Sequence, residues 1–482
     1  MLLFIKLIVE SDIIYKGTKT KMNSLSIFGT SSDAGKSTLS FAITYLLHHR
    51  GISVAPFKAQ NVSNNSQVTD AGGEIAIPQY FAAEAIGLKT TPDMNPVLLK
   101  SGGKSKAHMI VNGKSVGDKD VWGYYRDIDA LKPHVKKAFL KLQKKYDCIV
   151  AEGAGSPVEL NLMDKDLSNI YIADEFNTKI ILVADIQRGG VFASIYGVHH
   201  LLPKKLRKNV IGVIVNKFQG DMSLFDEGVK IIEKEFKIPV LGVVPFKPFN
   251  LGFEDSQSIM NYVQDTRDAK IKVGVIKLPH ISNFTDFEPL VVDKEVELSF
   301  ISNAGDMATC DLVVLPGSKR VVDDLEWLIE RGFEKILKSE DTKVVAICGG
   351  YEMMFENILD PLKIESDAKV TKGFGRLKGE VIFQKEKIVK KGTYRLFGCV
   401  VDGYEIHNGV AKKRCKSKKN LYATFVHGLF DSDEIRELIF SQINSDYKGY
   451  NFKKFKAKAI KEFASHIEKH VDINKIINEL KD

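Results

Sequence analysis

The sequence is poor in cysteine and lacks long apolar runs. Its five cysteines are odd in number and none belongs to a Cys-x-x-Cys pair, so we expect neither a disulfide framework nor a structural zinc site. Free thiols are typical of a reducing compartment, which predicts a cytoplasmic protein. No apolar segment reaches the roughly 18 residues that cross a bilayer, so the sequence predicts no membrane association.

Internal repeats, low-complexity tracts and basic stripes interleaved with aromatic residues are absent as well. The formal net charge of +8 comes mainly from lysine, with one local basic run at 411–419. Charge of this kind is typical of a solvated surface, and it also suits a polyanionic substrate. The sequence therefore predicts no nucleic-acid partner.

The length of 482 residues is enough for about two to three domains. A polar stretch at 254–270 is interpreted as a linker between a first domain at 22–262 and a second domain at 271–482. Charged residues interrupt the apolar start of 1–21 and no small-residue cleavage site follows. This segment is therefore interpreted as an extension rather than a signal peptide, and Met22 is the alternative starting methionine.

The first domain repeats one unit, in which a short apolar run precedes a polar or glycine-rich turn and a helical pattern. Runs that are apolar throughout are typical of strands buried on both faces of a parallel sheet. This pattern predicts a doubly wound α/β fold, in which ligands bind beyond the carboxyl ends of the strands. The runs cover residues 25–28, 148–151, 179–184, 210–215 and 240–244.

A second α/β series follows in the second domain and ends in an amphipathic tail. Its apolar runs cover residues 271–276, 312–315, 344–347 and 423–426. The tail, at 453–480, has apolar residues at helical spacing, and we expect it to dock on the second domain. The expected docking residues are Phe463, Ile467, Val471, Ile476 and Ile477.

A phosphate-binding turn follows the first apolar run. It reads Gly-Thr-Ser-Ser-Asp-Ala-Gly-Lys-Ser at 29–37 and precedes a helical pattern. The backbone N–H groups of such a turn, the helix N-terminus and the Lys36 ammonium converge on a phosphate, while the Ser37 hydroxyl is placed to ligate Mg²⁺. The expected phosphate-binding residues are Gly29, Thr30, Gly35, Lys36 and Ser37.

A second chemical centre lies at Cys348. An apolar run ends at this cysteine and two glycines follow, which permits the sharp strand-to-helix turn of a nucleophile elbow. A helix N-terminus favours the thiolate, and the N–H of Gly349, with a donor from the turn at Gly317, would stabilise an oxyanion. His427 follows another predicted strand and is the candidate base. A buried core cysteine is the alternative interpretation of Cys348.

The two centres and the motifs around them resemble the cobyric acid synthase family, the glutamine-hydrolysing amidotransferases of cobalamin biosynthesis, from Ser24 to the C-terminus. The first domain also resembles dethiobiotin synthetase. The motifs in the first domain are Pro-Phe-Lys-Ala-Gln-Asn at 56–61, Met-Asn-Pro-Val-Leu-Leu-Lys at 94–100, Glu-Gly-Ala-Gly-Ser-Pro-Val-Glu-Leu-Asn-Leu at 152–162, Asp-Ile-Gln-Arg-Gly-Gly-Val-Phe-Ala at 185–193 and Asn-Lys-Phe at 216–218. Those in the second domain are Pro-His-Ile-Ser-Asn-Phe-Thr-Asp-Phe at 279–287, Pro-Gly-Ser-Lys at 316–319 and Gly-Tyr-Glu-Ile-His at 403–407.

This resemblance implies a P-loop amide ligase domain followed by a class I glutamine amidotransferase-like domain. It implies that ATP phosphorylates the b, d, e and g carboxylates of adenosylcobyrinic acid a,c-diamide, and that ammonia from glutamine then displaces phosphate. Lys58 would neutralise charge on the phosphoryl group, Ser37 and Glu152 would hold Mg²⁺, and Asn216 would bind adenine. Cys348 would attack the glutamine amide, and His427 would protonate the departing ammonia.

Two positions depart from the family pattern in ways that bear on binding. The aspartate expected after a threonine of the first domain is displaced by one residue to Asp70, which puts its role as a metal ligand in doubt. Glu352 replaces the glutamine expected after the elbow tyrosine. A carboxylate there would add negative charge and weaken glutamine binding.

A third departure concerns the partner of His427. Class I glutaminases carry His-x-Glu, and here Leu429 occupies the glutamate position, which leaves a Cys–His pair. Asp431 and Glu405 are the candidates for orienting the histidine. Three further polar residues are interpreted either as contacts to the corrinoid or as structural: Asn283, Asp286 and His407.

Three alternative functions are weighed against this interpretation. Cobyrinic acid a,c-diamide synthase shares both domains, but the segments 283–286 and 403–409 fit the later enzyme better. A ParA/MinD-like switch ATPase is disfavoured because Thr30 stands where those proteins carry a signature lysine. An ammonia-dependent ligase with a defective glutaminase is consistent with Glu352 and Leu429.

Overall fold

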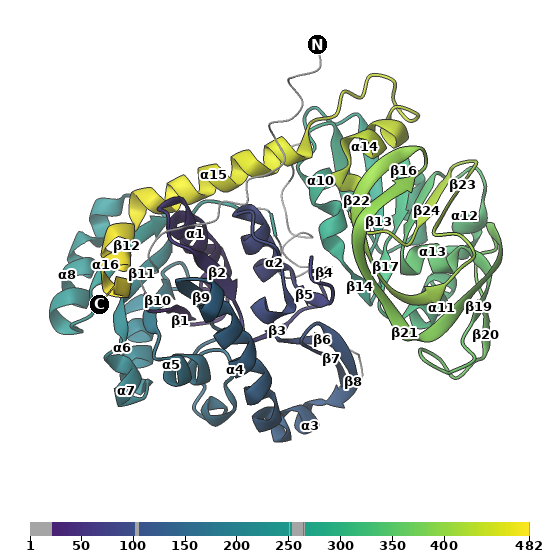
Figure 1. Ribbon diagram of the computed structural model, residues 1–482. Helices are drawn as coiled ribbons and strands as arrows, with labels where there is room; N and C mark the ends of the chain where they lie inside the picture. Colours follow the sequence, from purple (N-terminus) through teal and green to yellow (C-terminus); the bar gives the residue numbers. More distant parts are fainter. Residues whose placement is uncertain (1–21, 102–105, 250, 253–263, 265, 482) are drawn as a thin grey trace, which may run out of the picture.

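The computed structural model describes residues 22–101, 106–249, 251–252, 264 and 266–481. They form two lobes, and a long helix, α15 (Phe452–His470), runs from one lobe to the other (Figure 1). The predicted extension at 1–21 and most of the predicted linker at 254–270 lie outside the described residues.

The first lobe is built on a parallel sheet of strand order β12-β11-β10-β1-β9-β2. All five apolar runs of the first domain form strands of this sheet, as predicted, and β2 joins them at one edge. The strands are β1 (Leu25–Gly29), β2 (Val54–Phe57), β9 (Cys148–Glu152), β10 (Lys179–Asp185), β11 (Val210–Phe218) and β12 (Val240–Pro245).

Helices cover both faces of this sheet because its strands carry apolar side chains on both sides. One face packs on α1 (Lys36–His49) and α2 (Ile77–Ala85). The other face packs on two further sets, around α4 (Ile128–Lys145) and around α6 (Val191–Leu201). The remaining helices of this lobe are α3 (Val121–Arg126), α5 (Ile170–Phe176), α7 (Lys204–Arg207) and α8 (Asp226–Glu235).

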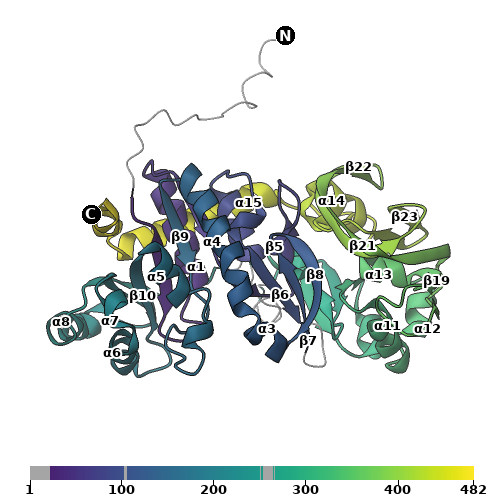
Figure 2. The same ribbon diagram turned by 60° about the horizontal axis from the view of Figure 1, so that its bottom comes forward.

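Small strands inserted between β2 and β9 face the second lobe (Figure 2). β3 (Gln60–Val62), β6 (Val97–Ser101), β7 (Lys106–Val111) and β8 (Lys114–Asp120) form one sheet, and β4 (Ser66–Val68) pairs with β5 (Glu74–Ala76). The single-turn helix η1 (Pro92–Met94) lies among them. These strands are short or polar, and the sequence analysis did not predict them.

The second lobe has a mainly parallel sheet of order β15-β13-β16-β18-β24-β23. Its strands are β13 (Ile271–Ile276), β15 (Val296–Ile301), β16 (Leu312–Leu315), β18 (Val344–Ile347), β23 (Cys415–Lys418) and β24 (Leu421–Thr424). Three predicted runs coincide with strands, and the fourth, 423–426, overlaps the end of β24. The helices are α10 (Glu288–Val291), α11 (Val321–Glu330), α12 (Glu334–Lys338), α13 (Gly349–Met353) and α14 (Asp433–Phe440).

A second, largely antiparallel sheet in this lobe was not predicted. It joins β20 (Val370–Lys372), β19 (Phe355–Leu359), β21 (Leu377–Leu396) and β22 (Cys399–Val410) in that order, and the long pair β21–β22 curves along the side that faces the first lobe. Two short segments, β14 (Ile281–Ser282) and β17 (Gly317–Ser318), pair with each other beside it.

The C-terminal helices pack on the first lobe, so the predicted docking on the second domain is wrong. α15 (Phe452–His470) and α16 (Ile473–Lys481) share one core with α1 and the parallel sheet, and the Asn23 N–H donates to Leu480 O at 2.7 Å. The receiving surface is aromatic, because the ring centroid of Phe463 lies 4.5 Å from that of Phe249 and 6.5 Å from that of Phe41. An apolar stripe shows that a helix docks, but not on which surface.

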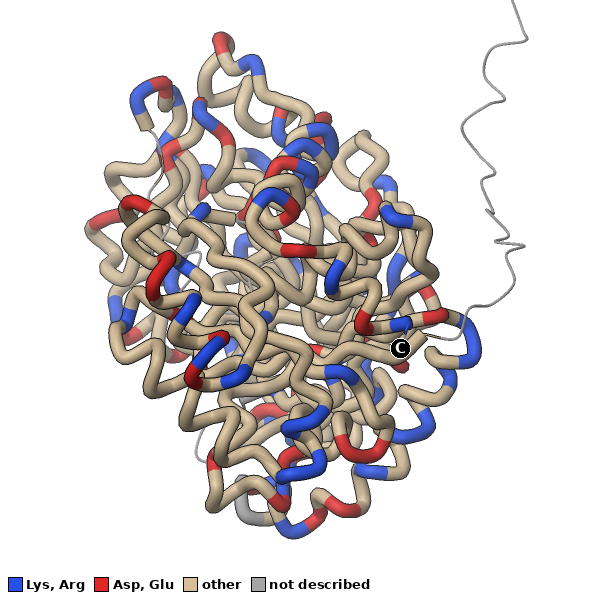
Figure 3. The backbone as a smooth tube through the Cα atoms, turned by 90° about the vertical axis from the view of Figure 1, so that its left-hand side faces the viewer, with Lys and Arg blue, Asp and Glu red and all other residues tan. Residues whose placement is uncertain are grey.

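Among the described residues, no helix is both long and apolar enough to span a membrane. Figure 3 shows that Lys and Arg are interspersed with Asp and Glu over the face it presents. This distribution agrees with the prediction of an ordinary solvated surface.

Candidate active sites

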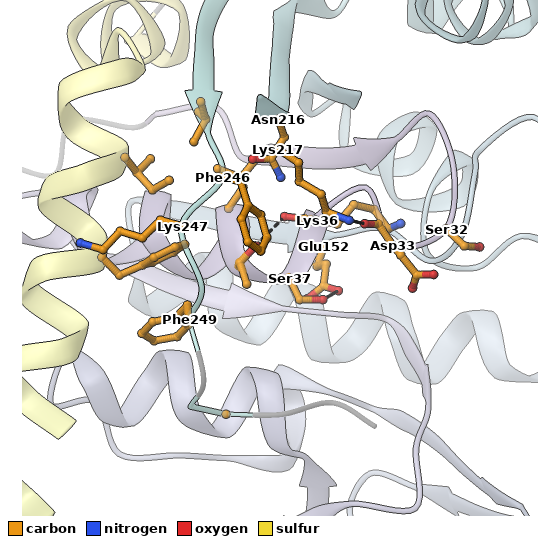
Figure 4. Close-up of a pocket in the computed structure, with 18 of the residues that line it drawn as sticks. Ser32, Asp33, Lys36, Ser37, Glu152, Asn216, Lys217, Phe246, Lys247 and Phe249 are labelled. Carbon is orange, nitrogen blue, oxygen red and sulfur yellow. Dashed lines mark hydrogen bonds between the residues drawn. The ribbon is translucent and has the colours of Figure 1, made fainter. Parts of the chain in front are cut away.

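The glycine-rich turn joins β1 to α1 and lines a cavity of about 670 Å³ (Figure 4). Gly35 has a φ of 94°, and a Cβ there would collide with Nδ2 of Asn216, so the position requires glycine. A Cβ at Gly29 would lie 2.7 Å from Nζ of Lys36. The Lys36 side chain therefore folds back over the turn, where it donates to Ser31 O at 3.3 Å.

Glu152, at the end of β9, connects the polar groups of this cavity. Its side chain is 3% exposed, and Oε1 accepts hydrogen bonds from Ser37 Oγ at 2.6 Å and Lys58 Nζ at 2.8 Å. Oε2 accepts from Gln79 Nε2 at 3.0 Å. A carboxylate beside a hydroxyl is a donor set that suits Mg²⁺, which takes one or two protein oxygens together with substrate phosphates. The residues present therefore fit the expected ion.

Asn216 and several less polar residues also line the cavity. Asn216, at the end region of β11, donates from Nδ2 to Ala34 O at 2.9 Å and so faces the turn. Phe246, half exposed, follows β12. Phe463 and His466 of α15 complete this wall. The sequence analysis missed the contribution of α15 because it placed the tail on the other domain.

The structure does not bring Asp70 together with Ser37 and Glu152. Its Oδ2 accepts from the N–H and the hydroxyl of Thr90, each at 2.8 Å, and its Oδ1 accepts from Lys391 Nζ of the second lobe at 2.7 Å. Asp70 lies between β4 and β5, which face the second lobe, and it does not line the cavity of the glycine-rich turn.

Cys348 lies in a strained turn between β18 and α13. Its φ of 53° and ψ of −110° fall in a region that side chains other than glycine rarely adopt. Its N–H donates to Thr424 O at 2.8 Å, which fixes the turn to the neighbouring strand. The predicted strand-to-helix elbow is present, and the thiol is 4% exposed.

The two candidate oxyanion glycines lie beside this elbow. A Cβ at Gly349 would lie 2.8 Å from the backbone nitrogen of Ser318, and one at Gly317 would lie 3.1 Å from Cε1 of His427. The segment β17 therefore packs directly on the elbow and on the histidine ring. A side chain at Gly349 would collide with the Ser318 backbone, and one at Gly317 would require the His427 ring to shift.

Asp286 orients His427, in place of the predicted Asp431 or Glu405. Its Oδ2 lies 2.7 Å from Nδ1 of the ring, and its Oδ1 accepts from the Gly428 N–H at 2.8 Å. Glu405 instead pairs with Arg414 at 2.6 Å. Asp286 precedes His427 by 141 residues, so no local spacing marks the pair.

The surroundings of His427 favour its protonated form. The ring is fully buried, and burial by itself lowers its pKa. The Asp286 carboxylate and the hydrogen-bonded Cys348 outweigh that effect and raise the pKa of His427 to about 10. The Tyr404 ring stacks on it with centroids 5.0 Å apart. The arrangement is a Cys–His–Asp triad, capable of nucleophilic attack followed by proton transfer.

Glu352 lies one turn beyond Cys348 and is 2% exposed. Burial, reinforced by the negative charges of Cys348 and Glu365, raises the pKa of Glu352 well above its usual value. A protonated carboxyl carries one O–H donor and a carbonyl acceptor, so it resembles a neutral amide more than a carboxylate does. The burial of Glu352 therefore disfavours the extra negative charge that the sequence analysis expected here.

The contacts of His407 are with other parts of the second lobe, which is consistent with a structural role. Its Nδ1 hydrogen-bonds Gly409 O at 2.7 Å, and its ring stacks on Phe425 with centroids 3.9 Å apart. Among the described residues, no cluster of three or more His, Cys, Asp or Glu could hold a metal ion by itself.

Comparisons with known proteins place the two lobes in one family. Residues 25–250 match the model of the CobQ/CobB/MinD/ParA nucleotide binding domain, and residues 272–435 match that of the CobB/CobQ-like glutamine amidotransferase domain. The cobyric acid synthase of Acinetobacter baylyi is 52% identical over 464 residues, which cover 96% of this chain and 100% of that protein. The chain belongs to the cobyric acid synthase family.

Other members of the family match over a similar extent. The cobyric acid synthase of Listeria monocytogenes is 37% identical over 486 residues, covering 93% of this chain and 95% of that protein. The match to a crystal structure of a glutamine amidotransferase covers 36% of this chain and 97% of the amidotransferase chain, with 13% identity and a TM-score of 0.28. This likeness is too weak to support an argument.

Family membership confirms the predicted fold class and the general chemistry. The protein is a ligase of cobalamin biosynthesis with a nucleotide-binding P-loop lobe and a glutamine amidotransferase lobe. Full-length similarity to cobyric acid synthases favours this activity over a,c-diamide synthase and over a ParA/MinD-like switch. We call the two lobes the synthetase lobe and the glutaminase lobe.

Proposed function

We propose that this protein uses ATP and glutamine to convert the b, d, e and g carboxylates of adenosylcobyrinic acid a,c-diamide to amides, giving adenosylcobyric acid. The observation that carries the proposal is the presence, in one chain, of the Ser37–Glu152–Lys58 cluster and the Cys348–His427–Asp286 triad. The cluster can activate a carboxylate, and the triad can release ammonia from glutamine.

In the synthetase lobe, phosphorylation turns a carboxylate, a poor electrophile, into an acyl phosphate with a good leaving group. Lys36 and Lys58 neutralise charge on the transferring phosphoryl group. Ser37 and Glu152 would hold Mg²⁺, which would supply further neutralisation of the phosphates. Asn216 and the wall that includes Phe246 and α15 accommodate the nucleoside end.

In the glutaminase lobe, the Cys348 thiolate attacks the amide carbon of glutamine. The N–H of Gly349 and the β17 segment at Gly317 stabilise the oxyanion. The His427 ring donates its proton to the departing ammonia, Asp286 holds the ring in place, and water then hydrolyses the thioester to release glutamate. Ammonia displaces phosphate from the acyl phosphate in the synthetase lobe.

The test is mass spectrometry of adenosylcobyrinic acid a,c-diamide after incubation with the protein, Mg²⁺, ATP and glutamine. A stepwise mass decrease, one step for each acid converted to an amide, is the expected result. Steps with ammonia but not with glutamine would indicate a ligase with a defective glutaminase. If neither nitrogen source changes the mass, the substrate assignment is wrong, and cobyrinic acid is the substrate to test next.

A further inference from the structure

One turn of the glutaminase lobe contacts both the catalytic histidine and the synthetase lobe. This turn is η4 (Phe284–Phe287), and Asn283 stands at its N-terminal end. Asp286 of the turn holds Nδ1 of His427, while Nδ2 of Asn283 lies 3.2 Å from Nε2 of the same ring. Thr285, between them, donates to Asn65 Oδ1 of the synthetase lobe at 3.4 Å.

The synthetase lobe fixes the orientation of the Asn283 amide. Ser66, the first residue of β4, directs its N–H to Asn283 Oδ1 at 3.4 Å. A backbone N–H can only donate, so the amide oxygen faces Ser66 and the NH₂ group faces His427. Asn283 is 3% exposed and adopts a left-handed φ of 52°, which holds the side chain in this place.

This orientation occupies the nitrogen that catalysis needs. When Nδ1–H donates to Asp286, the lone pair of Nε2 must accept the thiol proton before that proton can pass to ammonia. An N–H of Asn283 directed at Nε2 competes for the lone pair and disfavours the imidazolium. Asp286 and Cys348 act in the opposite sense and raise the pKa of His427 to about 10, so the Asn283 contact weakens the preference for the imidazolium without abolishing it.

The other side chains described here around the triad do not compete with Asn283 for Nε2 of His427. Tyr404 of β22 presents its ring face to His427, and Gly317 of β17 presents backbone. The pKa of the Tyr404 hydroxyl is raised by burial, so it stays neutral. Lys100 of β6, in the synthetase lobe, interacts electrostatically with Cys348.

We propose that Asn283 is a positioning residue that couples glutamine hydrolysis to the synthetase lobe. While Ser66 binds its oxygen, Asn283 restrains His427. When substrates in the synthetase lobe shift β4 and release that oxygen, the amide can rotate and accept a hydrogen bond from the protonated Nε2, which favours the thiolate–imidazolium pair. The inference rests on the proposed glutaminase roles of Cys348 and His427.

The test compares full-length Asn283→Gly and Asn283→Asp with the unaltered protein. Glycine adopts a left-handed φ without strain and removes the amide. Glutamate release from glutamine is measured without ATP and corrinoid, and then as a ratio to amide formed when both are present. In the Gly variant, hydrolysis of glutamine without ATP and corrinoid should rise about fivefold, as for loss of one hydrogen bond. With both substrates present, more glutamate should be released than amide is formed.

The Asp variant gives a readout that a merely structural role would not move. A carboxylate accepts from Ser66 N–H and from the protonated Nε2 together, so the imidazolium is stabilised. The pH profile of Cys348 alkylation by iodoacetamide should therefore shift to lower pH. The matched control Thr285→Val removes the neighbouring contacts to Asn65 and to the Tyr404 hydroxyl but none to the nitrogens of the His427 ring, and its profile should not shift.

Amidation with added ammonia separates the possible failures. If the unaltered protein amidates with neither ammonia nor glutamine, the proposed function fails. If it amidates, but Asn283→Gly leaves uncoupled hydrolysis unchanged or lower and Asn283→Asp leaves the alkylation profile unshifted, the coupling role is overturned. Intact ammonia-dependent amidation in both variants shows that they are folded.

Discussion

Asp286 shows what a single residue contributes that spacing along the chain does not reveal. The carboxylate reaches His427 from a turn at the start of the glutaminase lobe, whereas Leu429 fills the position where sequence patterns place an acid. The sequence analysis predicted Cys348 as the nucleophile and His427 as the base because each directly follows an apolar run. It treated Asp286 as undecided, since nothing local to either residue points to it.

At the residue scale, Cys348→Ser should abolish glutamine-dependent amidation and leave ammonia-dependent amidation intact, because ammonia bypasses the thioester. The matched variant Lys36→Ala should stop amidation from both nitrogen sources, because acyl phosphate formation fails. Both rates are measured by mass spectrometry of the corrinoid. Full glutamine use by Cys348→Ser would contradict its role as the nucleophile.

Asp286→Asn should make the glutaminase sensitive to rising pH. Burial lowers the pKa of His427, and the carboxylate offsets it, so removing the charge lowers that pKa from about 10. The protonated ring is then lost as pH rises, and the fall in glutamine-dependent rate should exceed about 100-fold near pH 8 and be smaller near pH 6. Ammonia-dependent rates serve as the control. An equal loss at both pH values would indicate that Asp286 acts through position alone.

At the scale of elements, the strands and helices with a clear hydrophobic pattern were the ones that the sequence predicted. The central strands β1, β9 and β10 are apolar throughout, and they were predicted almost to the residue. β21 and β22 were missed because exposed polar positions, many of them lysine in β21, dilute the alternation that marks a half-buried strand. α15 was predicted as a helix but assigned to the wrong lobe, because amphipathicity identifies a face and not its partner.

Phe463→Ala tests whether α15 serves the nucleotide site as well as the core. The side chain is 5% exposed, packs on Phe41 and Phe249, and lines the cavity. The free energy of unfolding of the synthetase lobe should fall by about 3–5 kcal/mol, and KM for ATP should rise while KM for glutamine is unchanged. The control is Phe455→Ala, at a more exposed site of the same helix. A stability loss with unchanged KM for ATP would limit α15 to packing.

At the scale of the whole molecule, buried charge joins the lobes. Glu74 of β5, 2% exposed, pairs with Lys100 of its own lobe and, at 3.0 Å, with Lys387 of the glutaminase lobe. Lys319, on the loop after β17, reaches Asn64 across the same boundary. The interface therefore brings together the loop after β17, the turn η4 and the inserted strands of the synthetase lobe.

Glu74→Gln should destabilise this interface by about 3–5 kcal/mol, because it leaves the buried Lys100 ammonium and the partly buried Lys387 ammonium without their carboxylate. Urea unfolding and limited proteolysis between the lobes provide the measurement. Asp70→Asn is the matched control: its pair with Lys391 is partly exposed, so the loss should stay within about 1 kcal/mol. Equal effects of the two variants would contradict a special role for Glu74.

The ion pairs of Glu74 also make the stability of the protein depend on pH. Burial raises the pKa of Glu74, but Lys100 and Lys387 outweigh it and hold that pKa well below 4.5. The carboxylate therefore stabilises the fold above about pH 4.5, and the stabilisation is lost as pH falls toward the lowered pKa. Glu74→Gln should remove this part of the acid sensitivity, as measured by urea midpoints across the acidic range.

The return of α15 and α16 to the synthetase lobe has a consequence for biosynthesis. β1 is translated well before the helices that cover α1 and hold Asn23 through Leu480. The synthetase lobe can therefore complete its core only after the strands of the glutaminase lobe have been translated. A gene split between the lobes would leave the N-terminal fragment with an uncovered aromatic groove that favours aggregation, unless 452–481 were supplied with it.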